Sequence, residues 1–271
     1  MTDAPLELAQ KLAARFAQLP QIEAVSLTGS QMMGIADASS DIDLYIYQHE
    51  DIPVSDRKAL AAPYREGAEF DLSFWGKEDT WYDLASGLRV EAIYWKVRSI
   101  EDNVEYVLRC FETAKGYSTA VLHSVRNGHI LFDRSGWLHR LQAEVQQPYP
   151  DGLRSAIIAA NHPIMRKATS SYVQQLGVAA QRRDLVSLNH RTAALLASYF
   201  DILFALNGVM NPGEKRLIPY AETLCDKRPP ELRAQVEGLL LSIASGDVTA
   251  AANALIDGLD DLLRAEGLYP L

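Results

Sequence analysis

The sequence predicts an α/β (α+β) domain with a small mixed sheet, followed by an all-α helical bundle. Segments rich in β-branched and aromatic residues, which are typical of strands, occur in the first half of the chain. After about residue 137, apolar residues recur at helical spacing and strand signals are few. The proline-containing stretch 146–150 separates the two patterns, so we expect one domain at residues 1–145 and a second at residues 146–271.

The first half is predicted to begin with an amphipathic helix. Its apolar face starts at Leu6, and Pro20 ends it. Residues 99–126 also have a helical pattern, and Asn127-Gly128 forms a turn after them. Strands are expected at residues 24–29, 42–48, 70–75, 89–95 and 129–132, with a loop and a short helix between residues 49 and 68.

The second half is predicted to be helical throughout. No internal repeat or low-complexity segment interrupts its helical pattern. The helices are expected at residues 151–183, 184–206, 214–226, 230–245 and 247–266.

Composition and charge narrow the class of protein. The formal net charge of −9 argues against a long nucleic-acid partner, because an acidic surface repels a phosphate backbone. The longest apolar stretch, residues 193–206, is too short to span a membrane, and the N-terminus lacks the features of a signal peptide. Cys110 and Cys225 are expected to be buried free thiols. These features predict a cytoplasmic protein without a membrane partner.

The most informative motif links two predicted strands. The first strand ends in Gly29-Ser30, and after ten intervening residues Asp41 and Asp43 begin the second strand. Side chains alternate along a strand, so the two carboxylates point to the same face. Mg²⁺ is usually held by one or two carboxylates together with substrate phosphates. Gly29 lets the backbone approach a phosphate closely, and Ser30 adds a hydroxyl and an N–H.

The alternative is a surface hairpin with an acidic edge. A single Asp-x-Asp pair is common on exposed strands. Both halves of this motif, however, lie in strongly apolar segments, where charged residues need a reason such as a metal ion. The sequence therefore favours a site for Mg²⁺ and a nucleoside triphosphate.

This motif resembles the signature of the polymerase β-type nucleotidyltransferase superfamily, in which Gly-Ser is followed by a spacer and then by Asp-x-Asp or Asp-x-Glu. The length of the spacer and Ser40 are most similar to the aminoglycoside (kanamycin-type) nucleotidyltransferases. The resemblance is strong over residues 22–48 and looser to about residue 140. Many members carry an arginine shortly after Gly-Ser, whereas this chain has Gln31, Met32 and Met33.

A third carboxylate is needed to hold a second metal ion or to deprotonate the attacking hydroxyl. Asp71 and Glu91 are the candidates, since each lies in an apolar strand-like segment, and the pattern alone does not separate them. The resemblance favours Glu91, because residues 90–94 are similar to the third acidic strand of the family. The family also places an acidic base on the first long helix of its second domain, but residues 154–183 contain neither Asp nor Glu. Either Glu91 is therefore expected to act as the base as well, or the acceptor differs from that of the family.

A triphosphate also needs a cation. Lys215 is the first candidate, because it follows a turn that opens a predicted helix, and Lys167 with Arg166 is the second. The alternative for Lys215 is a solvated helix end. Tyr94 and Trp95 have the ring faces to stack on a base, although packing in the core is the simpler interpretation.

The resemblance implies a nucleotidyltransferase domain that moves a nucleoside monophosphate, AMP from ATP in the simplest case, to a hydroxyl of a small molecule. An aminoglycoside- or lincosamide-like antibiotic is the expected acceptor. Asp41, Asp43 and Glu91 would hold two Mg²⁺ ions, while Gly29, Ser30 and Lys215 would bind ATP or another nucleoside triphosphate. Two alternatives stay open. One is transfer to a macromolecule, either a tRNA end or a protein side chain, and the other is a catalytically inactive protein that only binds nucleotide. The sequence does not name the acceptor, the preferred nucleotide or the oligomeric state.

Overall fold

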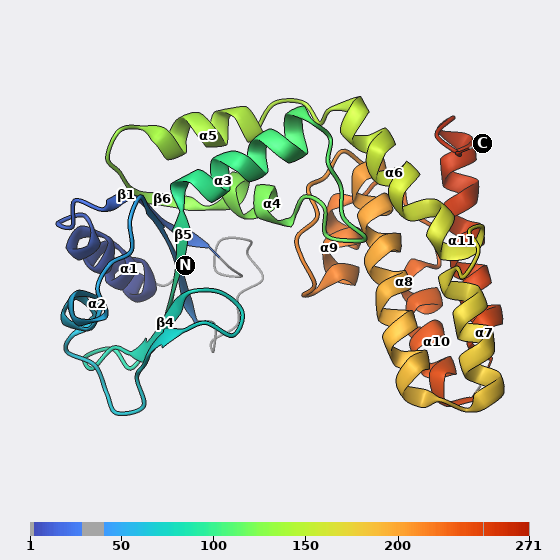
Figure 1. Cartoon of the computed structure of the whole chain (residues 1–271), viewed down its shortest axis with the longest axis horizontal. Helices are drawn as coiled ribbons and strands as arrows, with labels where there is room; N and C mark the ends of the chain where they lie inside the picture. The colour runs from blue at the N-terminus through green and yellow to red at the C-terminus, as the bar shows by residue number, and fades with distance from the viewer. Residues whose placement is uncertain (1–2, 29–40, 246, 271) are drawn as a thin grey trace. The chain divides into compact units, whose positions relative to one another are not determined.

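The computed structural model describes residues 3–28, 41–245 and 247–270. It divides into two compact units (Figure 1). The first combines Met1–Val104 with Ser124–Gln147, and the second combines Glu105–His123 with Pro148–Leu271. That residues 1–145 and 146–271 act as separate domains stays a prediction.

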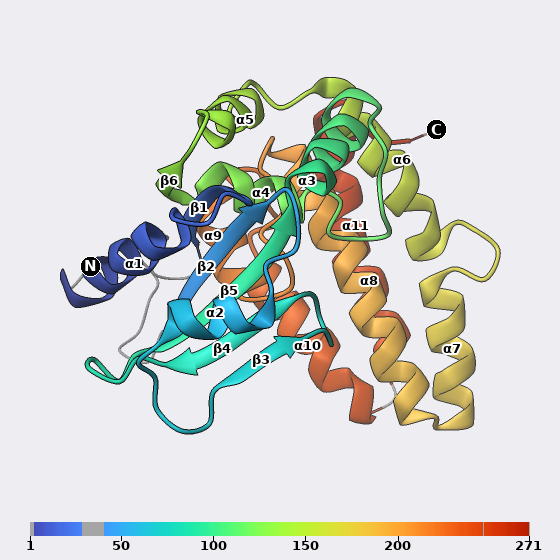
Figure 2. The ribbon, with the colours of Figure 1, turned by 60° about the vertical axis from the view of Figure 1, so that its left-hand side comes forward.

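The first unit is built on a six-stranded mixed sheet, seen in Figure 2. The strands are β1 (Ile22–Thr28), β2 (Ile42–Gln48), β3 (Glu69–Leu72), β4 (Glu78–Tyr82), β5 (Arg89–Lys96) and β6 (His129–Asp133). They lie in the order β3-β4-β5-β2-β1-β6. Neighbouring strands are antiparallel except β2 and β5, which run parallel. The predicted α+β class with a small mixed sheet is confirmed.

The two faces of this sheet differ in polarity. One face is apolar and packs beneath helices α1 (Asp3–Phe16) and α2 (Val54–Ala61), which lie on the same side of the sheet in Figure 1. Leu44 and Val90 are fully buried there, in one hydrophobic cluster with Leu12 and Phe16 of α1. Because side chains alternate along β2 and β5, residues next to Leu44 and Val90 in the sequence point to the opposite face.

The opposite face is partly covered at the far end of β2. Helix α5 (Trp137–Val145) places the Trp137 ring 5.3 Å from the ring of Tyr47. The Trp137 indole N–H donates a hydrogen bond of 3.1 Å to Glu101 on α3 (Val97–Val104), which fixes the orientation of the ring. The end of the face where β2 and β5 begin carries polar residues instead.

A buried ion pair joins α2 to β4. Arg57 and Asp79 are 1% and 0% exposed, and their charged atoms lie 2.5 Å apart. The Tyr94 hydroxyl and the backbone N–H of Asp71 also donate to Asp79, each at 2.8 Å. The Asp79 carboxylate thus satisfies three donors inside the apolar layer. Tyr94 belongs to this layer, as the core-packing interpretation expects.

The second unit is a helical assembly, which confirms the predicted all-α region. Besides residues 105–123, it contains α6 (Asp151–Arg166), α7 (Tyr172–Arg182), α8 (Leu185–Leu206), α9 (Leu217–Leu224), α10 (Leu232–Ser245) and α11 (Val248–Ala265). Helix α8 lies at its centre, and its residues from 197 to 206 are all buried. None of the helices in the described ranges is long and apolar enough to cross a membrane.

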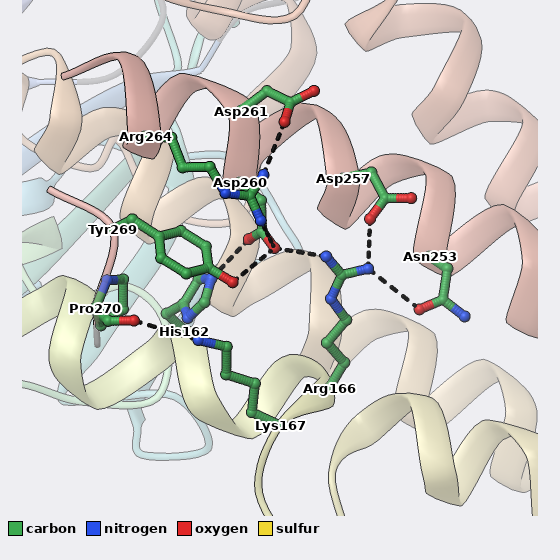
Figure 3. Close-up of polar contacts among 10 residues, drawn as sticks. All are labelled: His162, Arg166, Lys167, Asn253, Asp257, Asp260, Asp261, Arg264, Tyr269 and Pro270. Carbon is green, nitrogen blue, oxygen red and sulfur yellow. Dashed lines mark hydrogen bonds and ion pairs between the residues drawn. The ribbon is translucent and has the colours of Figure 1, made fainter. Parts of the chain in front are cut away.

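Figure 3 shows a charged network that holds α6 to α11. Asp260 on α11 is fully buried; it contacts His162 Nε2 at 2.7 Å and Arg166 Nη2 at 2.5 Å. Burial alone would raise the pKa of Asp260, but hydrogen bonds from His162 and Arg166 lower it below its usual value. The Tyr269 hydroxyl reaches the same carboxylate at 3.4 Å, so the network also secures the segment after α11.

The helix predicted over residues 99–126 is wrong in its middle. The chain forms α3, a π-helical turn over Glu105–Arg109, a loop, and then α4 (Ala120–Asn127). Buried Asp201 on α8 holds this loop, because it accepts hydrogen bonds from the backbone N–H and the hydroxyl of Ser118. Asn161 on α6 accepts another from the backbone N–H of Gly116. These long-range bonds replace the helical ones.

Three further predictions need correction. The helix expected over residues 151–183 is two helices, because Ser171 caps a new helix by accepting a hydrogen bond from Gln174 N–H. The strand expected over residues 70–75 ends at Leu72, and β4 follows it. Cys225 is buried as predicted, but Cys110 is exposed; both are free thiols.

Candidate active site

The strand register places polar residues in a row across four strands. Asp43 on β2 pairs with Thr28 on β1 at one side and with Glu91 on β5 at the other. Glu91 in turn pairs with Thr80 on β4. Neighbouring strands lie about 4.8 Å apart, so the Asp43 and Glu91 carboxylates share one face at short range. The parallel pairing of β2 and β5 therefore brings two predicted site residues together.

Arg89 links Asp41 to this row of polar residues. Its Nη1 lies 2.6 Å from Asp41 Oδ2, and its Nη2 lies 2.6 Å from Glu91 Oε1. Burial alone would lower the pKa of Arg89, but the charges of Glu91 and Asp41 raise it. One guanidinium thus bridges two of the predicted carboxylates. Sequence reasoning missed Arg89, although its position two residues before Glu91 places both side chains on one face of β5.

An aromatic pair lies farther along the same face. The ring of Tyr45, two residues after Asp43, is 5.9 Å from the ring of Trp95 on β5. Burial and the nearby charge of Asp43 raise the pKa of Tyr45, despite hydrogen bonds to Ser124 and Thr28. Tyr45 therefore stays a neutral phenol at physiological pH, and the carboxylates share one face of the sheet with this tilted aromatic pair.

Asp71 lies apart from these residues. It is on β3 at the edge of the sheet, and β4 separates β3 from β5. Its side chain is 58% exposed and forms an ion pair of 2.7 Å with Arg57. The geometry accordingly groups Glu91, and not Asp71, with Asp41 and Asp43.

The structure describes only some of the residues that the sequence predicts to bind phosphate. Gly29 and Ser30 lie outside the described residues. Lys215 is exposed in the segment before α9, within the second unit. Lys167, an alternative to Lys215, donates to the Pro270 carbonyl at 3.2 Å and lies over the Tyr269 ring. Its neighbour Arg166 is engaged by Asp257 and Asp260, so this second choice is committed to contacts inside the helical unit.

The donor chemistry of the carboxylate group suits Mg²⁺, since all its ligands are oxygen atoms. Within residues 3–28, 41–245 and 247–270, no three His, Cys, Asp or Glu side chains are close enough to form a metal centre. Arg89 instead lies against Asp41 and Glu91 and supplies positive charge to them. The residue types therefore suit Mg²⁺, but in this structure the Asp41 and Glu91 carboxylates pair with the Arg89 guanidinium.

Comparisons with known proteins give little about function. A family model described as a domain of unknown function (DUF4037) matches residues 115–217. No curated protein matches the chain. A solved structure from Exiguobacterium sibiricum 255-15, titled a nucleotidyltransferase-like protein, is similar at 15% identity with a TM-score of 0.46. The similarity covers 97% of this chain and 76% of that one. A similarity of this size does not establish a shared fold, so it carries no weight for the function of this chain.

Proposed function

We propose that this protein is a Mg²⁺-dependent nucleotidyltransferase that moves a nucleoside monophosphate, AMP from ATP in the simplest case, to a hydroxyl of a small molecule. The observation that carries the proposal is that Arg89 bridges Asp41 and Glu91, while Asp43 pairs with Glu91 in the register of the parallel strands β2 and β5. Their spacing relative to Gly29-Ser30 supports it independently, because that motif resembles the nucleotidyltransferase signature.

In this proposal the three carboxylates bind metal, and Glu91 is also the general base. Asp41, Asp43 and Glu91 would hold the metal, which when bound supplies positive charge that neutralises the phosphates. Glu91 accepts the proton of the acceptor hydroxyl. The hydroxyl oxygen forms a bond to the α-phosphorus, the bond between that phosphorus and the bridging oxygen breaks, and pyrophosphate leaves.

The acceptor in the proposal is a cationic small molecule, an aminoglycoside- or lincosamide-like antibiotic, in the cytoplasm. The net charge of −9 is compatible with a positively charged acceptor. Release of pyrophosphate from each of the four nucleoside triphosphates, measured against a panel of such acceptors, tests this. Release only with an RNA or protein acceptor would move the activity to a macromolecule, and nucleotide binding without release under all conditions would contradict an active enzyme.

Glu91→Gln should lower the turnover number by about a hundredfold or more, as the loss of a general base or metal ligand does, with only modest weakening of ATP binding. Asp71→Asn should change turnover little, because Asp71 lies at the sheet edge with Arg57. Steady-state rates of pyrophosphate release from both purified variants measure the difference. The reverse order of effects would assign the role to Asp71 and leave Glu91 as a strand residue.

Lys215→Ala should raise the KM for ATP far more than the KM for the acceptor, if Lys215 reaches the triphosphate. A cation on the β- or γ-phosphate stabilises charge that is present in both the ground and the transition state, so the turnover number should change less than KM. Lys227→Ala is a suitable control, because Lys227 is occupied by Glu266 at 2.5 Å. An unchanged dependence on ATP would make Lys215 a solvated surface residue.

A further inference from the structure

Arg89 holds two of the proposed metal ligands at once. Its guanidinium contacts Asp41 and Glu91 with separate nitrogen atoms, each at 2.6 Å. The three side chains are about one-third exposed, so solvent and a ligand can reach them. Arginine suits this position because its planar fork presents several fixed donors and stays charged at any physiological pH.

The same carboxylate oxygens cannot serve two cations equally well. A divalent ion that takes Asp41 and Glu91 as ligands would stand beside the Arg89 guanidinium, and like charges at this range repel. Metal binding therefore competes with the Arg89 ion pairs. Arg89 is the first residue of β5, and rotation of its long side chain can move the guanidinium while the strand stays in place.

The phosphates of the nucleotide offer the displaced guanidinium a new partner. They enter the site with the metal, and the fork of arginine matches the spacing of phosphate oxygens. We infer that Arg89 is an internal counter-ion of the site, which neutralises Asp41 and Glu91 in the metal-free protein and pairs with the phosphates of a metal-bound nucleoside triphosphate. This inference rests on the proposed function. It adds that Arg89 changes its partner from the carboxylates to the phosphates when a metal-bound nucleotide enters the site.

The inference predicts changes of opposite direction for two ligands. Arg89→Gln should tighten the binding of a divalent ion alone by about tenfold, because the competitor for the carboxylates is removed. The same substitution should weaken the binding of a metal-bound nucleotide by about tenfold, because a charge-assisted contact is lost. An arginine that only stabilises the strands would not produce both changes.

The test uses the full chain and two titrations. Mn²⁺ alone is titrated and free Mn²⁺ followed by electron paramagnetic resonance; a non-hydrolysable ATP analogue is then titrated by calorimetry at saturating Mn²⁺. Arg233→Gln is the matched control, because Arg233 also bridges two acids, Glu222 at 2.6 Å and Glu237 at 3.3 Å, within the second unit. It should match the unsubstituted protein in both titrations.

Arg89→Lys keeps a charge but loses the fork, and it serves if the Gln variant fails to fold. It should bind Mn²⁺ within about twofold of the unsubstituted protein and bind the analogue several-fold more weakly. Mn²⁺ binding no tighter in Arg89→Gln, or analogue binding unchanged in either variant, would overturn the role of Arg89 while leaving nucleotidyl transfer intact. Absence of Mn²⁺ binding by the unsubstituted protein would overturn both proposals.

Discussion

Asp43→Asn is expected to lower nucleotidyl transfer about a thousandfold while the protein stays folded. Asp43 lies at the centre of the polar row, between Thr28 and Glu91. An amide keeps the size of the side chain but removes the charge that a metal ion needs. Asp41→Asn should have a similar effect on activity, and initial rates of pyrophosphate release at saturating ATP measure both.

The two substitutions should differ in their effect on stability. Asp43→Asn should leave the melting temperature without metal unchanged or slightly higher, because one of several neighbouring negative charges is removed. Asp41→Asn also breaks an ion pair with Arg89 that is partly exposed, so it should cost at most about 1 kcal/mol. Asp102→Asn, which only weakens an exposed pair with Arg98 on α3, is the control for both. Full activity of Asp43→Asn would remove the basis for the site.

Asp79→Ala should lower the free energy of unfolding by about 3–5 kcal/mol, since it leaves the buried Arg57 guanidinium without its main partner. A typical domain has only about 5–15 kcal/mol of stability, so much of the protein should unfold at moderate denaturant concentration. Urea denaturation followed by circular dichroism measures the loss. The Tyr94 hydroxyl and the Asp71 N–H also lose their acceptor, which adds to the cost.

Asp71→Asn is the matched control for this prediction, because asparagine tolerates the left-handed backbone at Asp71. It removes the second carboxylate from Arg57, but Asp71 is 58% exposed, so the cost should stay below about 1 kcal/mol. Replacing both members of the buried pair, as in Arg57→Met with Asp79→Leu, should destabilise less than Asp79→Ala alone, because no buried unpaired charge remains. Equal losses for Asp79→Ala and Asp71→Asn would show that the buried pair is not what holds α2 to β4.

Sequence patterns predicted those helices and strands whose formation depends on residues close to one another in the sequence. Alternation along β2 correctly separates buried Ile42 and Leu44 from Asp43. Strand β4 was missed because Glu78, Asp79 and Thr80 are polar, and the partner that makes Asp79 tolerable in the core, Arg57, lies 22 residues away. The break after α3 was missed for a similar reason: it depends on buried acceptors far along the chain.

The arrangement of the candidate site also depends on contacts between residues that are far apart in the sequence. Each strand's polar face follows from its own sequence, but the contact between Asp43 and Glu91 requires that β2 pair with β5 in parallel and in one register. Nothing in either segment specifies its neighbour in the sheet. The bridge formed by Arg89 depends on this pairing as well, because Asp41 and Arg89 are 48 residues apart. The choice of Glu91 over Asp71 came from the resemblance, and their catalytic roles stay predictions.

The most direct test follows the two ends of ATP in one reaction with a hydroxyl-bearing acceptor. ATP labelled at the α-phosphate should transfer its label to the acceptor, and ATP labelled at the γ-phosphate should release its label as pyrophosphate, in both cases only with Mg²⁺ and not with Asp43→Asn. Label from the γ-phosphate on the acceptor would instead show a kinase, and no transfer from any nucleoside triphosphate to any acceptor class would contradict the proposed function.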